Sequence, residues 1–488
     1  MSAVMFRRSA LSILMATALA SCSLAPVYER PNAPVTAAWP NQPKANYGGY
    51  TQATTVGTQT AEAVAPAGAL AAAELGWKEF FLDVRLQTLI ELALVNNRDM
   101  RVAVLRVDEA RAQFGIQRGA QWPQLSGGAQ GSRQSTPSDV RVGGAAAPSV
   151  TSQNQSGSAL TSFELDLFGS LRNLSEAAYQ NYLATEQAQK SAHISLISSV
   201  AQAYFNQPAQ VQVELTQRTL QSRQEFFQLV QTRFDAGVAS ELDLNQAKTL
   251  LDSASVSLAQ LVRPRAQADN ALVLLIGLPL PVDLPELATF GREQLLASVP
   301  AGLPSDMLER RPDILAAENQ LKVANANIGA ARAAFFPNIS LIGFFGSASP
   351  SLDELFSGGK FLSFSPSIMV PIFAGGGLIE GLSLAKARDN IAVAQYEQAI
   401  QQAFREVSDT LAGEATYTAQ LDAQRALEAS SARTLELSNL RYDSGVDSYL
   451  QAQTVQVDFF NAQIALAQTG LASLSNRVEL HKALGGGS

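Results

Sequence analysis

Cysteine and histidine are almost absent from this chain. Its 488 residues include one cysteine, Cys22, and two histidines, His193 and His481. A single cysteine excludes an intrachain disulfide, and the two histidines lie far apart in helical patterns, where we expect solvated positions. P-loop, dinucleotide-binding, GxSxG and HExxH motifs are missing as well. We therefore predict no catalytic residue, no metal site, no cofactor and no enzymatic activity.

Charge is also scarce. Charged residues make up 16% of the chain, the formal net charge is −8, and lysine and arginine form no cluster after the N-terminal region. Because nucleic-acid binding requires a basic surface that neutralises phosphates, we exclude nucleic acid as a partner. Long apolar runs are missing too, since no later segment has 18 consecutive apolar residues, and we expect no transmembrane helix in the mature chain.

Residues 1–21 have the pattern of a secretory signal peptide. Two arginines precede an apolar stretch over 9–19 that is too short to span a bilayer as a mature helix. Small residues stand directly before Cys22, where cleavage is expected. A lone cysteine can also be a buried free thiol, but this position favours a lipobox, in which Cys22 becomes the acylated first residue of a bacterial lipoprotein. By similarity to such lipoproteins, Ser23 favours sorting to the outer membrane.

The mature chain contains two copies of one unit. A constant offset of 214 positions relates the segment starting at Asp99 to the segment starting at Asp313. Further along, RFDAGVAS at 233–240 recurs as RYDSGVDS at 441–448, at an offset of 208. Units of about 200 residues are far too long for a solenoid repeat. We therefore predict a duplicated half-molecule whose two halves act together. The first register also pairs Ala110 with Ala324, Gly115 with Gly329, Arg118 with Arg332 and Pro123 with Pro337.

Helix and strand signals divide the mature chain into four parts. The expected parts are an extended anchor or tether over 22–83, a first repeat over 84–277, a proline-rich linker over 278–305 and a second repeat over 306–488. In each repeat a proline ends a first helix, and two segments with alternating apolar residues follow, which is a strand pattern. The expected strands cover about 123–134, 157–168, 338–347 and 361–373.

A very long helix follows each strand pair. Residues 171–236 contain no glycine and one proline, which predicts a helix of roughly 100 Å if it is continuous, and 378–444 is its counterpart. Each ends at the repeated turn, where Gly237 and Gly445 suit a left-handed C-cap, and a shorter helix returns. Two prolines, at which we expect local bends, fall inside the helical segments: Pro208 and Pro264.

The strands have the length that crosses a bilayer, about 9–11 residues. An open sheet edge in hydrocarbon leaves unpaired backbone groups, which cost several kcal/mol each. Four strands cannot close a barrel, because about eight are the practical minimum. We therefore predict that several copies pool their strands in one membrane barrel, which continues into a tube of long, alanine-rich helices.

Six motifs of this chain resemble those of the TolC-like outer membrane factors, most closely the lipoprotein drug-efflux subgroup typified by OprM. They are CSLAPVYERP at 22–31, NNRDMR at 96–101, FELDLFG at 163–169, LPSDMLERRPD at 303–313, IGAARAAFFP at 328–337 and KALGGG at 482–487. The resemblance implies a mainly α fold with membrane β: a homotrimer whose 12-stranded β-barrel lies in the outer membrane and continues into an α-helical barrel in the periplasm.

The resemblance also implies partners and a function. The partners are a periplasmic adaptor (a membrane fusion protein) and an inner-membrane pump of the resistance-nodulation-division type, besides outer membrane lipid. The function is passive conduction of drugs from pump and adaptor to the exterior in a multidrug efflux system. The two repeated turns would be the tips where the adaptor binds. The tip residues are Asp235, Gly237, Val238, Asp443, Gly445 and Val446.

The pore-closing residues follow the second turn in this family. Members carry Tyr-Leu followed by Leu-Asp-Ala-Gln, whose Leu and Asp rings narrow the closed pore. Here Tyr449 and Leu450 are present, but Thr454 stands at the acidic position. A Leu450 ring remains as the gate, with an ordinary seam residue as the alternative. Asp447 and Asp243 either supply negative charge at the mouth or are exposed acids at helix ends.

Two alternatives stay open within the channel class, a duct for metal ions and a duct for type I protein secretion. Outside that class, a periplasmic coiled-coil scaffold anchored only by its lipid does not explain the alternating strand pairs. No sequence feature identifies the drugs, the pump or the adaptor.

Overall fold

The computed structural model describes most of the chain in two compact units. The described residues are 23–36, 39, 76–135, 141–142, 145–146, 150–206, 209–281, 283–285, 308–349, 359–444, 446–447 and 449–486. The first unit comprises 1–32, 106–186 and 316–397, and the second comprises 33–105, 187–315 and 398–488. Each unit therefore takes segments from both repeats. The expected signal peptide, Cys22 and most of the linker 278–305 lie outside the described residues.

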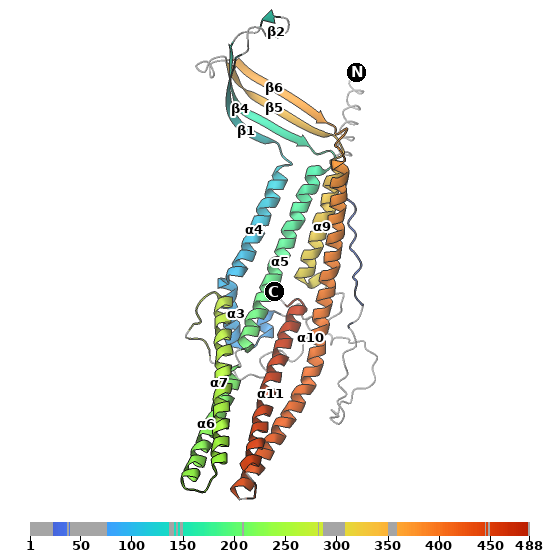
Figure 1. Cartoon of the computed structure of the whole chain (residues 1–488). Helices are drawn as coiled ribbons and strands as arrows, with labels where there is room; N and C mark the ends of the chain where they lie inside the picture. Colours follow the sequence, from blue (N-terminus) through green and yellow to red (C-terminus); the bar gives the residue numbers. More distant parts are fainter. Residues whose placement is uncertain are drawn as a thin grey trace. The chain divides into compact units, whose positions relative to one another are not determined.

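The first unit carries a four-stranded antiparallel sheet in the order β1-β4-β5-β6 (Figure 1). The strands are β1 (Gln124–Ser135), β4 (Val150–Leu165), β5 (Asn338–Ser349) and β6 (Gly359–Met369), and a short ribbon pairs β2 (Arg141–Val142) with β3 (Ala145–Ala146). Pairing of β4 with β5 joins the two repeats. Strands β1 and β6 are the two edges of this sheet.

The register gathers most apolar side chains on one face of the sheet, while the other face mixes serines with Ile342, Phe344 and Phe361. Phe163 of β4 lies opposite Leu341 of β5, which lies opposite Pro366 of β6. One residue further along, Glu164 lies opposite Ser340. Because successive side chains of a strand point to opposite faces, the apolar residues of three strands gather on one side. That face is formed by Phe163, Leu165, Ile339, Leu341, Phe345, Leu362, Phe364 and Ile368.

Strand β4 begins earlier than expected. It starts at Val150, whereas the alternation of apolar side chains suggested about 157. Apart from Val150 the extra residues are polar, and they pair with β1 from Thr151 opposite Gln134 to Ser156 opposite Ala129. Backbone pairing needs no apolar side chain, so the alternation marks only the part of the strand that has an apolar face.

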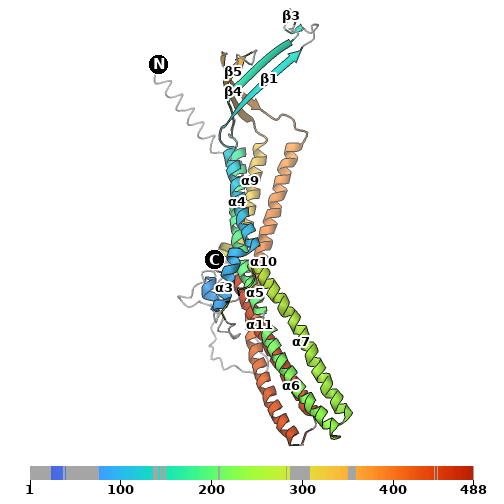
Figure 2. The same cartoon turned by 90° about the vertical axis from the view of Figure 1, so that its left-hand side faces the viewer.

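Four helices continue from the sheet (Figures 1 and 2), and the parts of them within 106–186 and 316–397 belong to the first unit. They are α4 (Arg98–Gly119), α5 (Ser170–Asn206), α9 (Pro312–Ala333) and α10 (Gly377–Asp443). Phe114 of α4 packs on Tyr179 of α5 with ring centroids 5.2 Å apart. Gln320 of α9 donates a hydrogen bond of 3.0 Å to Asn181 of α5. Within this unit α5 therefore lies between α4 and α9.

The second unit has the main hydrophobic core. It surrounds α2 (Trp77–Phe80) and α3 (Val84–Asn96) and includes Phe81, Ile90, Tyr204, Leu272 and Val478. His481 is 4% exposed and stacks on Phe80 with ring centroids 4.2 Å apart. The expectation of a solvated His481 is therefore wrong. The sequence around His481 could not predict this contact, because the aromatic residues of α2 precede His481 by some 400 positions in the chain.

In the second unit, the same kind of hydrogen bond to the end of a helix occurs once in each half of the sequence. Asn97 Nδ2 donates a hydrogen bond of 2.7 Å to the carbonyl of Leu275, and Arg311 Nη1 donates one of 2.8 Å to the carbonyl of Ala483. Both acceptors lie just before a left-handed glycine, Gly277 with φ 79° or Gly485 with φ 92°. The acceptors differ by 208 positions and the donors by 214, so these contacts follow both sequence registers.

The long helices mostly follow the expected limits. Helix α10 has 67 residues. In the first repeat, α5 ends at Asn206 and α6 (Ala209–Asp235) follows, and Pro208 lies outside the described residues. Helix α7 (Glu241–Ile276) runs through Pro264, and α11 (Tyr449–Ala483) closes the chain. None of the helices in the described ranges is long and apolar enough to cross a membrane.

Candidate functional site

The first turn ends α6 with a Schellman motif. The amide of Val238 donates to the carbonyl of Arg233 at 2.9 Å, and the amide of Gly237 donates to Phe234 at 2.8 Å. Gly237 has φ +75°, a conformation that favours glycine. A Cβ built on Gly237 would meet nothing within 4 Å. The local sequence therefore forms a sharp turn with open space around its glycine.

The second turn repeats the first of these bonds at the end of α10. The amide of Val446 donates to the carbonyl of Arg441 at 2.9 Å, as Val238 does to Arg233. The Arg441 guanidinium also binds the carboxylate of Asp447 through two hydrogen bonds of 2.8 Å. These bonds hold the pKa of Asp447 below its ordinary value. Gly445 and the side chain of Asp443 lie outside the described residues.

Asp243 caps the helix that follows the first turn. Its carboxylate accepts hydrogen bonds from the amide and hydroxyl of Ser240, while Ser240 Oγ accepts from the amide of Asp243 at 3.2 Å. This is a capping box at the start of α7. The bond from the Ser240 hydroxyl lowers the pKa of Asp243. Asp243 and Asp447 are therefore both held by neighbours in their own turns.

The two turns expose apolar side chains. Val238 is 77% exposed, Val446 is 64% exposed and Leu242 is 65% exposed. Asp235 is exposed beside them and accepts a hydrogen bond of 2.9 Å from Gln231. The first tip thus presents exposed apolar side chains next to an exposed carboxylate.

The two helical hairpins contact each other within the second unit. Arg233 Nη1 of α6 donates a hydrogen bond of 3.1 Å to the hydroxyl of Tyr442 on α10. Further from the turns, Gln456 of α11 lies 3.5 Å from Ser222 of α6. Figure 2 shows the α6–α7 and α10–α11 hairpins with these turns at their ends. The two tips therefore contact each other through the hydrogen bond between Arg233 and Tyr442.

Two of the expected gate positions, 450 and 454, lie on the first turns of α11. Thr454 is exposed, whereas Ala452 and Val455 are buried. The side chain of Leu450 lies outside the described residues. Positions 450 and 454 are four residues apart and share one face of the helix. The backbone thus places the expected leucine and threonine positions on the face that carries exposed Thr454.

Residues 23–32, which directly follow Cys22, form a strap that binds α9. The sequence predicted an extended tether in this region but not these contacts. Arg332 Nη1 donates a hydrogen bond of 2.9 Å to the carbonyl of Leu24. Arg30 and Tyr28 both donate to the carboxylate of Glu318, and Lys322 lies 3.1 Å from it. Burial alone would raise the pKa of Glu318, but hydrogen bonds from Arg30 and Lys322 outweigh burial and lower it.

Gly329 allows the strap to approach α9. A Cβ at Gly329 would lie 2.5 Å from Asn173 Nδ2 and 2.8 Å from Ala25 Cβ, whereas one at Gly115 would meet nothing within 4 Å. The repeated glycine was the available sequence signal for this contact. It could not show which copy is covered, because both copies look alike in sequence.

The structure assigns no ion-binding cluster to these segments. In the ranges described above, no group of three or more His, Cys, Asp or Glu residues is arranged to hold a metal ion. Among the described residues, the turns, the α11 face and the strap present no nucleophile with an adjacent base.

Comparisons with known proteins agree along nearly the whole chain. The family described as outer membrane efflux protein matches residues 89–278 and 303–486. The antibiotic efflux pump outer membrane protein ArpC of Pseudomonas putida is 45% identical over 471 residues, covering 96% of this chain and 93% of ArpC. The toluene efflux pump outer membrane protein TtgC, also of Pseudomonas putida, has the same identity and coverage. The open Neisseria gonorrhoeae MtrE outer membrane channel superimposes with a TM-score of 0.82 at 38% identity, covering 96% of this chain and 98% of MtrE.

Proposed function

Because this chain belongs to the outer membrane efflux protein family, we propose that three copies form an exit duct for antibiotics and organic solvents. The protein is an outer membrane channel and a component of an efflux pump system, and it is not an enzyme. The cargo is inferred from relatives: ArpC is named for antibiotic efflux and TtgC for toluene efflux.

The four-stranded sheet is the observation that carries the trimeric duct. Its apolar face is uncovered in the single chain, with Leu362 78% exposed and Phe364 67% exposed. Its edges, β1 and β6, need partners, because unpaired backbone groups cost several kcal/mol each in hydrocarbon. Pairing β6 of one copy with β1 of the next satisfies both edges. Three copies make a 12-stranded barrel, with the more apolar face toward lipid and the face that carries Ser340, Ser363, Ser365 and Ser367 toward the pore.

We propose that the helices of the three copies continue the duct as an α-helical barrel. The repeat organisation supports this, since each half contributes one long helical path that ends in a sharp turn. The two turns, with exposed Val238 and Val446, are the proposed docking sites of a periplasmic adaptor that links the duct to an inner-membrane pump of the resistance-nodulation-division type. Asp235, Gly237, Asp443 and Gly445 are included among the proposed docking residues.

Leu450→Ala should open the channel. We propose that a ring of Leu450 side chains closes the pore, because a desolvated apolar constriction resists water. In planar bilayers, Leu450→Ala should raise single-channel conductance several-fold, and cells carrying it should become sensitive to vancomycin. Thr454→Ala is the matched control on the same helix face, and it should change little because it removes no charge. An opening effect of Thr454→Ala alone would place the gate in a polar network instead.

Cys22→Ala should prevent lipidation without abolishing the duct. Cys22 is proposed as the lipid anchor, and a single acyl chain binds membranes only marginally, whereas a closed barrel is held by its whole strand belt. Labelling with a radioactive fatty acid should disappear, while a heat-modifiable trimer should persist in the outer membrane, shown by different SDS gel migration before and after boiling. Continued labelling of the variant would contradict the lipobox assignment.

A further inference from the structure

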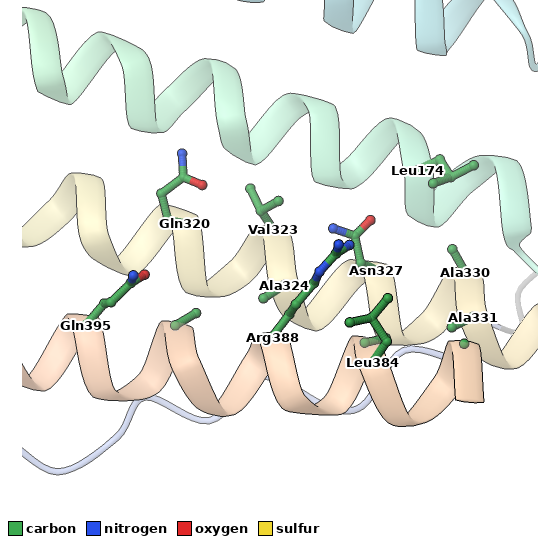
Figure 3. Close-up of a pocket in the computed structure, with 13 residues that line it drawn as sticks. Leu174, Gln320, Val323, Ala324, Asn327, Ala330, Ala331, Leu384, Arg388 and Gln395 are labelled. Carbon is green, nitrogen blue, oxygen red and sulfur yellow. The ribbon is translucent and has the colours of Figure 1, made fainter. Parts of the chain in front are cut away.

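A hollow of about 450 Å³ lies among α5, α9 and α10 of the first unit. Apolar side chains make up much of its wall, including Leu174, Val323 and Leu384. Arg388 is the one charged side chain among its 13 lining residues. Figure 3 shows Arg388 of α10 extending across the hollow toward Asn327 of α9.

The Arg388 guanidinium has no ion-pair partner in the described part of the chain, and no carboxylate lines the hollow. The amides of Asn327 and Gln395 lie in the same wall. A guanidinium offers five donors in a planar fork that suits carboxylate, sulfonate or phosphate groups. A free fork beside apolar walls is complementary to a molecule with an anionic group and an apolar body.

The strap shows on which side of the helix layer this hollow lies. Contacts with the strap come from Glu318, Lys322, Gly329 and Arg332 of α9. At 3.6 residues per turn these positions lie on the opposite side of α9 from the hollow-lining ones. The lining residues of α9 are Gln320, Val323, Ala324, Asn327, Ala330 and Ala331.

The strap follows directly after Cys22, the proposed lipid anchor. An anchored acyl chain must reach the bilayer, so the strap lies on the outer surface of the proposed helical barrel. The opposite side of α9 then faces the lumen. We infer that the hollow around Arg388 is a lumenal binding site for amphipathic organic anions in transit through the duct.

A neighbouring hollow helps to assign the selectivity to Arg388. It has a volume of about 240 Å³, shares Leu174 and Asn327 with the first, and is lined by Gln113 and Ile116 without any charged side chain. Both hollows therefore accept apolar groups, but only the first offers a cation. Removing Arg388 should leave the apolar walls and abolish the preference for anions.

This inference rests on the proposed duct, so the test separates the two. Purified full-length protein is titrated by calorimetry with naphthalene-1-sulfonate and with the matched cation naphthalen-1-ylmethylammonium. Wild type should prefer the sulfonate, and Arg388→Gln should weaken sulfonate binding about tenfold, as expected for a lost hydrogen bond to a charged group. Arg388→Glu should reverse the preference. Lys386→Gln is the matched control, because Lys386 is exposed on the same helix and does not line the hollow.

The lumenal position has its own test in planar bilayers. In a Cys22→Ser background, Arg388→Cys should react with a membrane-impermeant thiosulfonate, and the conductance should fall, whereas Lys386→Cys should leave it unchanged. A protein that forms no pore contradicts the proposed function. Two results would overturn the anion site alone while the protein still forms a pore. One is equal sulfonate affinity of wild type and Arg388→Gln, and the other is a thiol of Arg388→Cys that stays unreactive because another copy covers it.

Discussion

Replacing Gly237 with tryptophan should remove most of the drug resistance that this channel supports, while trimer levels stay normal. Gly237 has φ +75°, and a Cβ there would point into open space. The indole would therefore project from the tip beside Val238, which is 77% exposed. Strain at the turn costs about 1–2 kcal/mol, too little to unfold a trimer, but the added ring obstructs the proposed adaptor contact.

The measurement is drug susceptibility of cells that depend on this channel, with the trimer quantified on unboiled gels. Gly237→Ala is the matched control, because it introduces the same backbone strain without the bulk. It should retain most of the resistance. Gly445→Trp should act like Gly237→Trp, since both glycines occupy equivalent places in the repeated turn. Unchanged resistance with normal trimer levels would show that the adaptor binds elsewhere on the helices.

Gly277→Ala should destabilise the protein far more than the equivalent change in the second repeat, Gly485→Ala. Both glycines have positive φ, so both substitutions add backbone strain of about 1–3 kcal/mol. A Cβ at Gly277 would also lie 2.6 Å from the carbonyl oxygen of Asn96, whereas one at Gly485 would have its nearest contact at 3.7 Å. The obstructing atom belongs to the backbone, so no side chain can turn away.

Displacing Asn96 also disturbs Asn97, whose side-chain amide donates a hydrogen bond to the carbonyl of Leu275. We therefore expect Gly277→Ala to yield little heat-modifiable trimer, and to lower the thermal midpoint of helix loss measured by circular dichroism by many degrees. Gly485→Ala should yield normal trimer and a shift of a few degrees. Equal midpoints for the two variants would show that the Asn96 backbone moves at little cost.

Features that depend on neighbouring residues could be predicted from the sequence. Gly237 marks the turn because a Schellman motif needs a left-handed residue directly after the helix, and it involves only residues 233–238. The apolar face of β5 and β6 followed from period-2 alternation in the same way. The family match confirmed the resemblance that the six motifs indicated.

Features that join distant residues could not be predicted. The strap binds Glu318, nearly 290 positions after Arg30, and nothing near either residue indicates the other. Asp447 was expected to be a pore charge or an exposed acid, but which neighbour holds it depends on how the second turn brings Arg441 within 2.8 Å. The roles of Leu450 and Thr454 in the pore remain predictions.

By itself, the sequence determined the duplication, the order of helices and strands, the sites of the turns and the membership of the efflux family. These depend on local backbone preference, on side-chain periodicity and on motifs, all of which act over a few residues. Tertiary structure alone decided that β4 pairs with β5, that the strap covers Gly329 and not Gly115, and that Arg388 lines a hollow. The physical reason is that two equivalent halves offer equivalent surfaces, and only the packing of distant segments makes one of them different.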